Sequence, residues 1–193
     1  MPLDLSILNP EQKRAVEEIE GPSIIIAGAG SGKTRVLTYK IAYLLESGIS
    51  PFEILALTFT NKAAKEMKER IISLAGEGLE KIWMGTFHSI FARLLRIEAD
   101  FLGFTRNFTI YDTDDSVSMI RQLMTSNSMP TDNPTPKAIQ NAISSIKNKL
   151  ILPVEFSTIS RTPFDKKVEI IYGDYQKALF KNNAMDFDDL LIK

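Results

Sequence analysis

The sequence predicts an α/β protein with a parallel sheet in its first half and an all-helical second half. The first observation is that short apolar runs alternate with helical patterns as far as Tyr111, as in sheets whose parallel strands are joined by helices. The second is a glycine-rich turn between the first apolar run and the helix after it. The third is that, beyond Asp112, apolar residues recur at helical spacing with no further clear strand.

The first expected strand covers residues 23–27, a continuous run rich in isoleucine that is typical of a strand buried on both faces. Gly28, Gly30 and Gly32 follow and supply backbone dihedrals that other residues avoid. A helix beginning near Gly32 would direct its unpaired N–H groups and its positive dipole end to the same point. The segment therefore predicts a turn that wraps around an anion.

The other elements of the first half follow from the same periodicities. A helix begins with Asn9 as its cap and Pro10 as its first residue, and Gly21 is its expected stop. Further helices are expected over residues 33–48, 61–76 and 90–101, and further strands over residues 54–59, 82–84 and 108–111.

The second half shows helical patterns over residues 117–124, 139–150 and 165–179, and a last apolar pattern over residues 187–191. A turn-rich connector, residues 126–136, separates the first two of these patterns. Thr135 and Pro136 at its end are expected to be the cap and first residue of the next helix.

Composition bounds the possible functions. With 193 residues and 44% hydrophobic content, the chain is long enough for one core, or for one core and a smaller satellite, and so for one or two domains. A net charge of −1 creates no global basic field, so contacts with nucleic acid would depend on local groups. The absence of cysteine excludes disulfides and thiolate metal sites. Without a signal-peptide pattern or a membrane-spanning apolar run, a cytoplasmic protein with no membrane partner is expected.

The glycine-rich turn comes within one residue of the nucleotide-binding pattern G-x-x-x-x-G-K-[ST]. Ala27 stands where the first glycine is usual, and Gly32, Lys33 and Thr34 complete the pattern. The Lys33 ammonium is expected to reach the β and γ phosphates, and the Thr34 hydroxyl to ligate Mg2+. A chance glycine-rich turn is the alternative, but the order of strand, loop and helix argues against it.

Two similar polar and aromatic segments follow the next two expected strands, at the edge where open α/β sheets bind ligands. Their polar groups suit helix caps, with Asn61 a good cap, while Phe59 either fills core or offers a face for stacking on a base. The only histidine, His88, has no neighbouring nucleophile or metal-ligand motif, so nucleophilic catalysis and a zinc site are rejected. The two segments are Phe59, Thr60 and Asn61, and Thr86, Phe87 and His88.

Several polar residues have two interpretations from sequence. Gln12 is placed either to bond back to its helix cap or to present its amide to a purine, and the sequence by itself favours the cap. Asp112 ends an apparent strand, as Mg2+-binding acids do in nucleotide-binding proteins, but acids at a helix start explain it equally. The acidic cluster at residues 186–189 has the same ambiguity.

Five segments, in this order and spacing, closely resemble the UvrD/Rep/PcrA group of superfamily 1 DNA helicases. They are LNPEQKRAV, AGAGSGKTRVL, LTFTNKAAKEMKER, GTFHS and MDFDDLL. The resemblance spans the whole chain and implies a P-loop NTPase (RecA-like) parallel sheet with helices on both faces, plus an inserted all-helical subdomain. It further implies an ATP-driven motor that moves 3′ to 5′ on single-stranded DNA and unwinds duplex DNA in repair or replication.

The resemblance also implies roles for individual residues. Lys33 and Thr34 would serve catalysis, with Thr34 on Mg2+, and Gln12 would read adenine in preference to acting only as a cap. The two segments at the sheet edge would line the single-strand track. The ATP-binding set would be Gln12, Ala27, Gly28, Ala29, Gly30, Ser31, Gly32, Lys33, Thr34 and Arg35.

The same resemblance divides the chain into three parts. Residues 1–111 would begin motor domain 1A, residues 112–184 would form inserted subdomain 1B, and residues 185–193 would start the return into 1A. Asp112 would then open the insertion and hold no metal. The family's Asp-Glu block and its γ-phosphate arginines are absent, so the chain is expected to be a monomeric N-terminal fragment of a longer helicase, inactive by itself. Repair or replication proteins would be its partners.

Two other functions remain open from sequence. A nucleotide kinase or GTPase also uses a P-loop, but Asn61-Lys62 is followed by two alanines where a guanine reader needs Asn-Lys-x-Asp. A non-catalytic module that docks on duplex DNA or a partner protein is the second. Its candidate phosphate contacts are Lys147, Lys149, Lys166 and Lys167.

Overall fold

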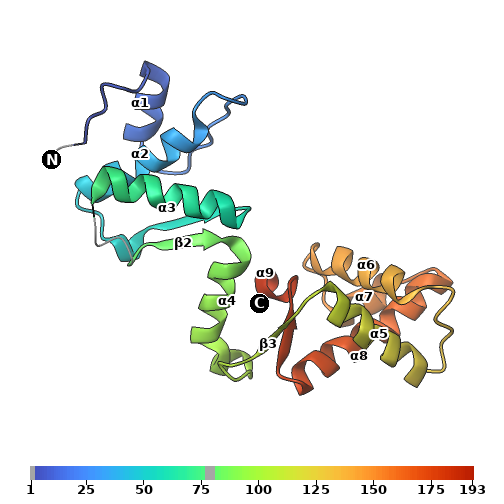
Figure 1. Ribbon diagram of the computed structural model, residues 1–193. Helices are drawn as coiled ribbons and strands as arrows, with labels where there is room; N and C mark the ends of the chain where they lie inside the picture. Colours follow the sequence, from blue (N-terminus) through green and yellow to red (C-terminus); the bar gives the residue numbers. More distant parts are fainter. Residues whose placement is uncertain (1–2, 77–80) are drawn as a thin grey trace. The chain divides into compact units, whose positions relative to one another are not determined.

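The computed structural model describes residues 3–76 and 81–193 of the chain. It divides into two compact units, Met1–Ile90 and Phe91–Lys193 (Figure 1). Both units combine helices with a short parallel sheet. The chain is therefore a mixed α/β protein, as its alternating patterns predict.

The first unit contains a two-stranded parallel sheet and the helices around it. Strand β1 (Leu55–Thr58) pairs with β2 (Trp83–Thr86), with Leu55 opposite Trp83 and Thr58 opposite Thr86. The remaining elements are α1 (Pro10–Glu17), α2 (Lys33–Glu46), the short helix η1 (Pro51–Glu53), α3 (Asn61–Ala75) and the start of α4 (Phe87–Glu98). Helix α3 makes the crossover that a parallel pair of strands requires.

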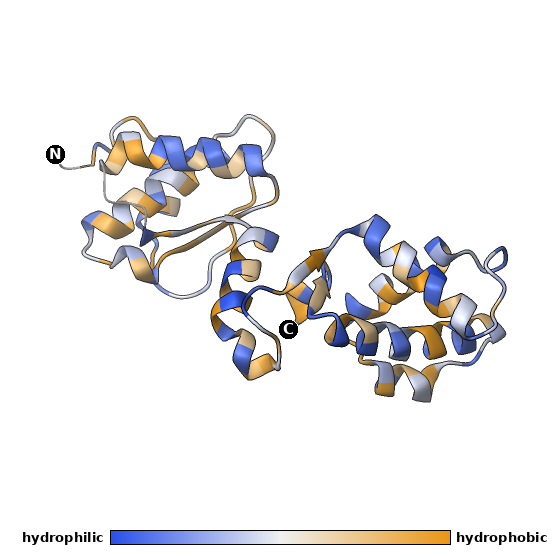
Figure 2. Ribbon diagram, turned by 60° about the horizontal axis from the view of Figure 1, so that its bottom comes forward, coloured by the Kyte–Doolittle hydropathy of each residue, from blue (hydrophilic) through white to orange (hydrophobic). Residues whose placement is uncertain are grey.

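The core of the first unit lies between this sheet and helices α2 and α3. One cluster joins the sheet to both helices, and a second joins α1 to α2. The clusters are Ile41, Ile54, Ala56, Met67, Ile71 and Ile82, and Leu8, Val16, Val36 and Tyr39. Figure 2 shows apolar and polar residues mixed along each helix, as expected of helices with one buried face.

The second unit contains the rest of α4 and a helical bundle on a second parallel sheet. Strand β3 (Thr109–Tyr111) pairs with β4 (Ala184–Asp186), with Thr109 opposite Ala184 and Tyr111 opposite Asp186. Between these strands run α5 (Thr113–Ser126), α6 (Pro136–Lys147), α7 (Pro153–Ile159) and α8 (Pro163–Lys181). The short helix η3 (Ala99–Leu102) precedes β3, and α9 (Asp189–Ile192) follows β4. The whole bundle is thus the crossover of this sheet (Figure 1).

Strand β4 is buried along its length, and its side chains alternate between two cores. Ala184 joins the core of the bundle, whose largest members include Ile139, Ile171 and Tyr172. Met185 joins a different cluster, formed with α4, η3 and the segment before β3. The β3–β4 sheet therefore has the bundle on one face and α4 on the other.

The expected strand at residues 23–27 is wrong. The segment is irregular, and Ile24 and Ile26 are 91% and 95% exposed. A strand needs a neighbour for its backbone N–H and C=O groups, and none of the described strands pairs with this segment. The other three expected strands, at residues 54–59, 82–84 and 108–111, are confirmed as β1, β2 and β3.

The expectation of an all-helical second half is also wrong, because β4 lies in it. Three residues are too few to show a period in sequence. Helix α7 was not expected, although Pro153 at its first position and Glu155 at its third mark a helix start. Helix α1 ends at Glu17, before the expected stop at Gly21.

Asp112 is a helix cap. Its carboxylate accepts hydrogen bonds from the backbone N–H groups of Asp114 (2.8 Å) and Asp115 (2.9 Å) at the start of α5. The Asp115 carboxylate in turn accepts a hydrogen bond from the Asp112 N–H, which completes a capping box.

No helix within residues 3–76 and 81–193 is long and apolar enough to cross a bilayer.

Candidate functional site

Helix α2 begins differently from the other long helices. In α1, α3, α5, α6 and α8 a cap side chain accepts a hydrogen bond from the first turn. Helix α2 begins after Gly32, no side chain caps it, and its first turn has Lys33 and no acid. The N–H groups and positive dipole end of this helix are therefore available to an anion, and Lys33 adds a full positive charge.

The glycine loop is defined as residues 27–34, the turn before α2 together with the first two residues of that helix. Its curvature depends on Gly30 and Gly32, whose φ angles of 76° and 87° suit glycine. The hydroxyl of Ser31 closes the loop by donating to the Gly28 carbonyl at 2.7 Å. The Lys33 ammonium donates to the carbonyls of Ala27 (2.9 Å) and Gly28 (2.7 Å), so it lies inside the loop.

Gln12 links α1 to the glycine loop. Its backbone N–H donates to Asn9 Oδ1 at 2.8 Å, and its Oε1 accepts from the Asn9 N–H at 3.2 Å, so the predicted cap is confirmed. Its Nε2 donates to the Ser31 carbonyl at 2.9 Å. A primary amide has two N–H donors and two acceptor lone pairs. After these contacts Gln12 retains one of each.

Sequence reasoning missed Lys40, which holds α1 in place. Its ammonium donates to the carbonyl of Ala15 at 3.1 Å and to that of Glu18. These carbonyls lie at the C-terminal end of α1, where a cation is favoured by the helix dipole. Lys40 thus anchors the helix that carries Gln12, a contact between α1 and α2 that no local sequence pattern marks.

The structure brings four of the ten expected nucleotide residues to one pocket of about 280 Å³. Gln12, Ala27, Ser31 and Lys33 line it together with exposed isoleucines of the segment before the loop. Arg35 instead lines a separate pocket of about 540 Å³ with Thr38, Tyr39 and Arg70. Thr34 is exposed in the first turn of α2.

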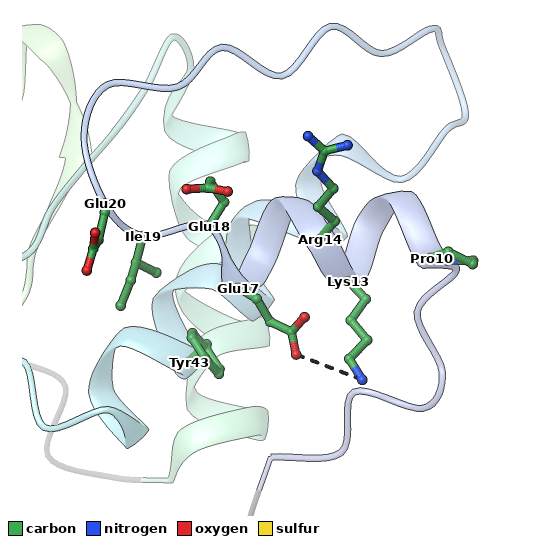
Figure 3. A pocket seen from close by; sticks show the side chains of 8 residues that line it. All are labelled: Pro10, Lys13, Arg14, Glu17, Glu18, Ile19, Glu20 and Tyr43. Carbon is green, nitrogen blue, oxygen red and sulfur yellow. Dashed lines mark ion pairs between the residues drawn. The ribbon is translucent and has the colours of Figure 1, made fainter.

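A larger pocket, of about 660 Å³, lies along α1 and contains none of the expected residues (Figure 3). Its lining mixes charges of both signs, including an exposed ion pair of 3.8 Å between Lys13 and Glu17. With acids and bases interleaved, this surface has no single charge that would select a ligand.

The two aromatic segments come together because their strands are paired in register. Thr58 lies opposite Thr86 at the ends of β1 and β2, so Phe59 and Phe87 leave the sheet at the same edge. Their ring centroids are 6.3 Å apart with an edge-to-face angle of 64°. Phe59 is 93% exposed, so its ring presents a large apolar surface beside backbone and hydroxyl groups.

The polar residues of these segments also cap helices. Thr60 Oγ1 accepts from the Ala63 N–H at 3.2 Å and so is the cap of α3, which places Asn61 inside the helix and corrects the expected cap. Thr86 Oγ1 accepts from the Ser89 N–H at 3.3 Å in the first turn of α4. The exposed pair Lys65–Glu69, at 4.0 Å, lies on the solvated face of the same helix.

One expected phosphate contact is wrong. Lys147 is completely buried and pairs with Asp186 and Asp189, so it is not available to DNA. Lys149 is exposed, Lys166 pairs with Glu169 at 2.8 Å, and the Lys167 ammonium lies 3.5 Å from the Asn133 carbonyl. The acidic cluster at residues 186–189 is therefore partly an internal ion-pair site. No group of three acidic or histidine side chains suited to a metal occurs within residues 3–76 and 81–193.

Comparison with known proteins identifies the family of this chain. Residues 8–193 match the model of the UvrD/REP helicase N-terminal domain. The chain is 49% identical over 189 residues to the ATP-dependent DNA helicase PcrA of Bacillus subtilis (strain 168), a match that covers 97% of this chain and 26% of the relative. PcrA of Staphylococcus epidermidis is 48% identical over 186 residues, with 96% and 26% covered.

The chain thus has the N-terminal region of a helicase, and it belongs to the UvrD/Rep helicase family. It spans about a quarter of the length of the curated relatives that it matches.

Replacing Gly32 by alanine is expected to strain the glycine loop. A Cβ atom at Gly32 would lie 2.8 Å from Gln12 Nε2, and the φ of 87° would place alanine in the left-handed region. That conformation costs roughly 1–2 kcal/mol for a residue with a side chain. Gly32→Ala should therefore lower the free energy of unfolding by about this amount, measured by urea denaturation with the fluorescence of Trp83.

Gly28→Ala is the matched control. No atom lies within 4 Å of a Cβ at Gly28, and its φ is not positive. Its stability should stay within about 0.5 kcal/mol of the parent protein. Equal stability of the two variants would contradict the described loop geometry.

Proposed function

We propose that this chain is the N-terminal ATP-binding region of an ATP-dependent helicase. The whole enzyme would move 3′ to 5′ on single-stranded DNA and unwind duplex DNA in repair or replication. The observation that carries the proposal is the uncapped N-terminus of α2, with Lys33 held inside the glycine loop. The relatives named ATP-dependent DNA helicase PcrA support the same assignment.

The residues around the loop fit ATP. The loop amides, the α2 N-terminus and the Lys33 ammonium supply the positive potential that a triphosphate needs. The remaining N–H and lone pair of Gln12 match the donor and acceptor on the amino edge of adenine. Thr34 would ligate the accompanying Mg2+, and Arg35 would lie beside the base. Bound ATP would supply the phosphoryl group for hydrolysis, while these residues orient it.

The aromatic edge of the first sheet fits a DNA strand. Base stacking on Phe59 is independent of sequence, as a translocating motor requires. Thr60, Asn61, Thr86 and His88 would contribute hydroxyl, amide and imidazole groups to the phosphates, with Phe87 supporting the Phe59 ring. A net charge of −1 is compatible with this mode, because local donors and stacking replace a global basic field.

We further propose that residues 1–111 and 185–193 belong to a RecA-like P-loop motor domain 1A. Residues 112–184 would be the inserted subdomain 1B. The β3–β4 pairing supports this division, because the strands before and after the bundle lie side by side.

Gln12→Ala should weaken ATP binding selectively. Loss of a bidentate contact to a purine costs about 1–3 kcal/mol, so the Kd for ATP should rise about 5- to 150-fold. The Kd for inorganic triphosphate should not change, whereas Lys33→Ala should weaken both ligands. Isothermal titration calorimetry of the three proteins measures these constants. Tighter binding of GTP than of ATP by the parent chain would instead favour a GTPase.

Hydrolysis by this chain is expected to be negligible. The acid that activates water and the arginines that stabilise the transition state are not among its recognised motifs, and they contribute most of the catalysis in such motors. Steady-state phosphate release should equal that of Lys33→Ala. Release well above that variant would show that the described residues suffice for turnover.

Phe59→Ala should weaken binding of single-stranded DNA. Stacking of one base is worth about 1–3 kcal/mol, so the Kd for an oligothymidylate should rise about 5- to 150-fold by fluorescence anisotropy. Phe101→Ala removes a ring that is 89% exposed, similar to Phe59, but outside the proposed track. It should leave the Kd unchanged, and equal losses in both variants would refute the stacking role.

A further inference from the structure

Lys147 is an unusual residue for the interior of a helical bundle. It is the last residue of α6, and its side chain has no exposed surface. Its ammonium donates to Asp186 Oδ2 at 2.7 Å and lies 3.0 Å from Asp189 Oδ1. The Tyr175 hydroxyl, from α8, donates to the same Asp186 oxygen at 3.1 Å. One buried cation therefore joins the bundle to the segment that leaves it.

The two aspartates are held rigidly against each other. The Asp189 N–H donates to Asp186 Oδ1 at 2.8 Å, and the Asp186 N–H donates to Asp189 Oδ2 at 3.3 Å. Asp186 is the last residue of β4 and Asp189 the first of α9, so these two hydrogen bonds tie the end of the strand to the start of the helix. The ion pairs consequently orient β4 and α9, and do not merely neutralise two flexible side chains.

The position of the ion pairs in the sheet is informative. Ala184 and Asp186 lie on one face of β4, toward the bundle, while Met185 packs with residues of α4 such as Leu95 on the other. Apolar contacts on the bundle face are non-directional, but charge-assisted bonds to Lys147 are directional. Lys147 is thus placed to set the orientation of the bundle on the sheet.

Burial of the charged groups of Lys147, Asp186 and Asp189 costs free energy. Burial raises the pKa of the Asp189 carboxyl above its usual range, against the opposing effect of Lys147 and with a further increase from Asp186. Ion pairs in such surroundings often add little stability over apolar residues of similar volume, and the best-attested reason for one is that it specifies a single arrangement.

We propose that Lys147 is a positioning residue: through Asp186 and Asp189 it fixes the α5–α8 bundle in one orientation on the β3–β4 sheet, opposite α4. The consequence for activity rests on the proposed function. In that function the bundle would be the inserted subdomain of a helicase, so loss of its orientation on the β3–β4 sheet would impair duplex unwinding.

The test is a distance measurement that does not depend on ATP or DNA. The chain contains no cysteine, so spin labels can be placed at two introduced sites by Ile97→Cys on α4 and Asn141→Cys on α6. Both positions are exposed and lie in the second unit. Double electron–electron resonance then reports the distribution of distances between α4 and the bundle.

The variant is Lys147→Met, which keeps the length of the side chain and removes its charge. Lys149→Met is the matched control, because Lys149 is exposed and two residues further along the chain. The parent protein and Lys149→Met should give the same single narrow distribution. Lys147→Met should keep its helical circular dichroism, because the apolar core of the bundle is intact, but its narrow peak should be lost to a broad or split distribution.

If Lys147→Met does not fold, Asp186→Asn decides the question, because it removes one ion pair at nearly constant volume and leaves the apolar core unchanged. A broadened distribution in Asp186→Asn supports the proposal. A narrow, unshifted distribution in a folded variant of either position overturns it and leaves the ion pairs with a purely local role.

A second measurement addresses the consequence for activity. In a helicase that contains this chain, Lys147→Met should retain ATP hydrolysis stimulated by single-stranded DNA and lose duplex unwinding. Lys181→Met is the control here, because Lys181 is exposed and is the last residue of α8, as Lys147 is of α6, and it should retain both activities. Equal loss of both activities, despite an altered distance distribution, would show that Lys147 serves only the stability of the fold and has no specific role in unwinding. Failure of ATP hydrolysis in the parent protein would refute the proposed function and leave the distance result standing.

Discussion

Parallel pairing of short strands is the constraint on which the rest of this structure depends. Two parallel neighbours cannot be joined by a tight turn, so each pair requires a crossover that leaves one end of the sheet and returns to the other. In the first unit the crossover includes helix α3. In the second it is the whole α5–α8 bundle. The α5–α8 bundle is therefore a long crossover, and it leaves the pairing of the strands on either side of it intact.

The same constraint creates the two parts of the candidate site. Parallel strands end at the same edge, so residues that follow β1 and β2 meet there, and this brings Phe59 beside Phe87. The glycine loop lies at the start of helix α2. No side chain caps this helix N-terminus, so its backbone N–H groups are available as donors to a ligand. Function is concentrated where local structural preferences are not satisfied internally.

Charge is used differently in the interior and at the surface. The exposed pairs on the helices, such as Lys65–Glu69, are solvated and contribute little. Lys147 is a lysine of the same intrinsic chemistry, but burial changes its role, since a desolvated cation must be met by carboxylates with defined geometry. The net charge of the chain is thus a poor guide to where its electrostatic interactions matter.

Local patterns determined most of the elements and their order, since helical periodicity, caps and β-branched runs are properties of neighbouring residues. Helices α2, α3, α5, α6 and α8, strands β1 to β3, and the Asn9, Thr135 and Asp112 caps all follow from such patterns. The glycine loop was recognised for the same reason.

Tertiary structure decided the remainder. It brought Phe59 beside Phe87, because that contact depends on the in-register pairing of β1 with β2. It left residues 23–27 irregular because a strand exists only beside a partner, and it made residues 184–186 a strand because β3 is available to pair with them. It also buried Lys147 between two aspartates that are 39 and 42 residues away in sequence, a contact that depends on the return path of the chain. Pairing partners and long-range ion pairs are set by chain topology, which no local window of sequence contains.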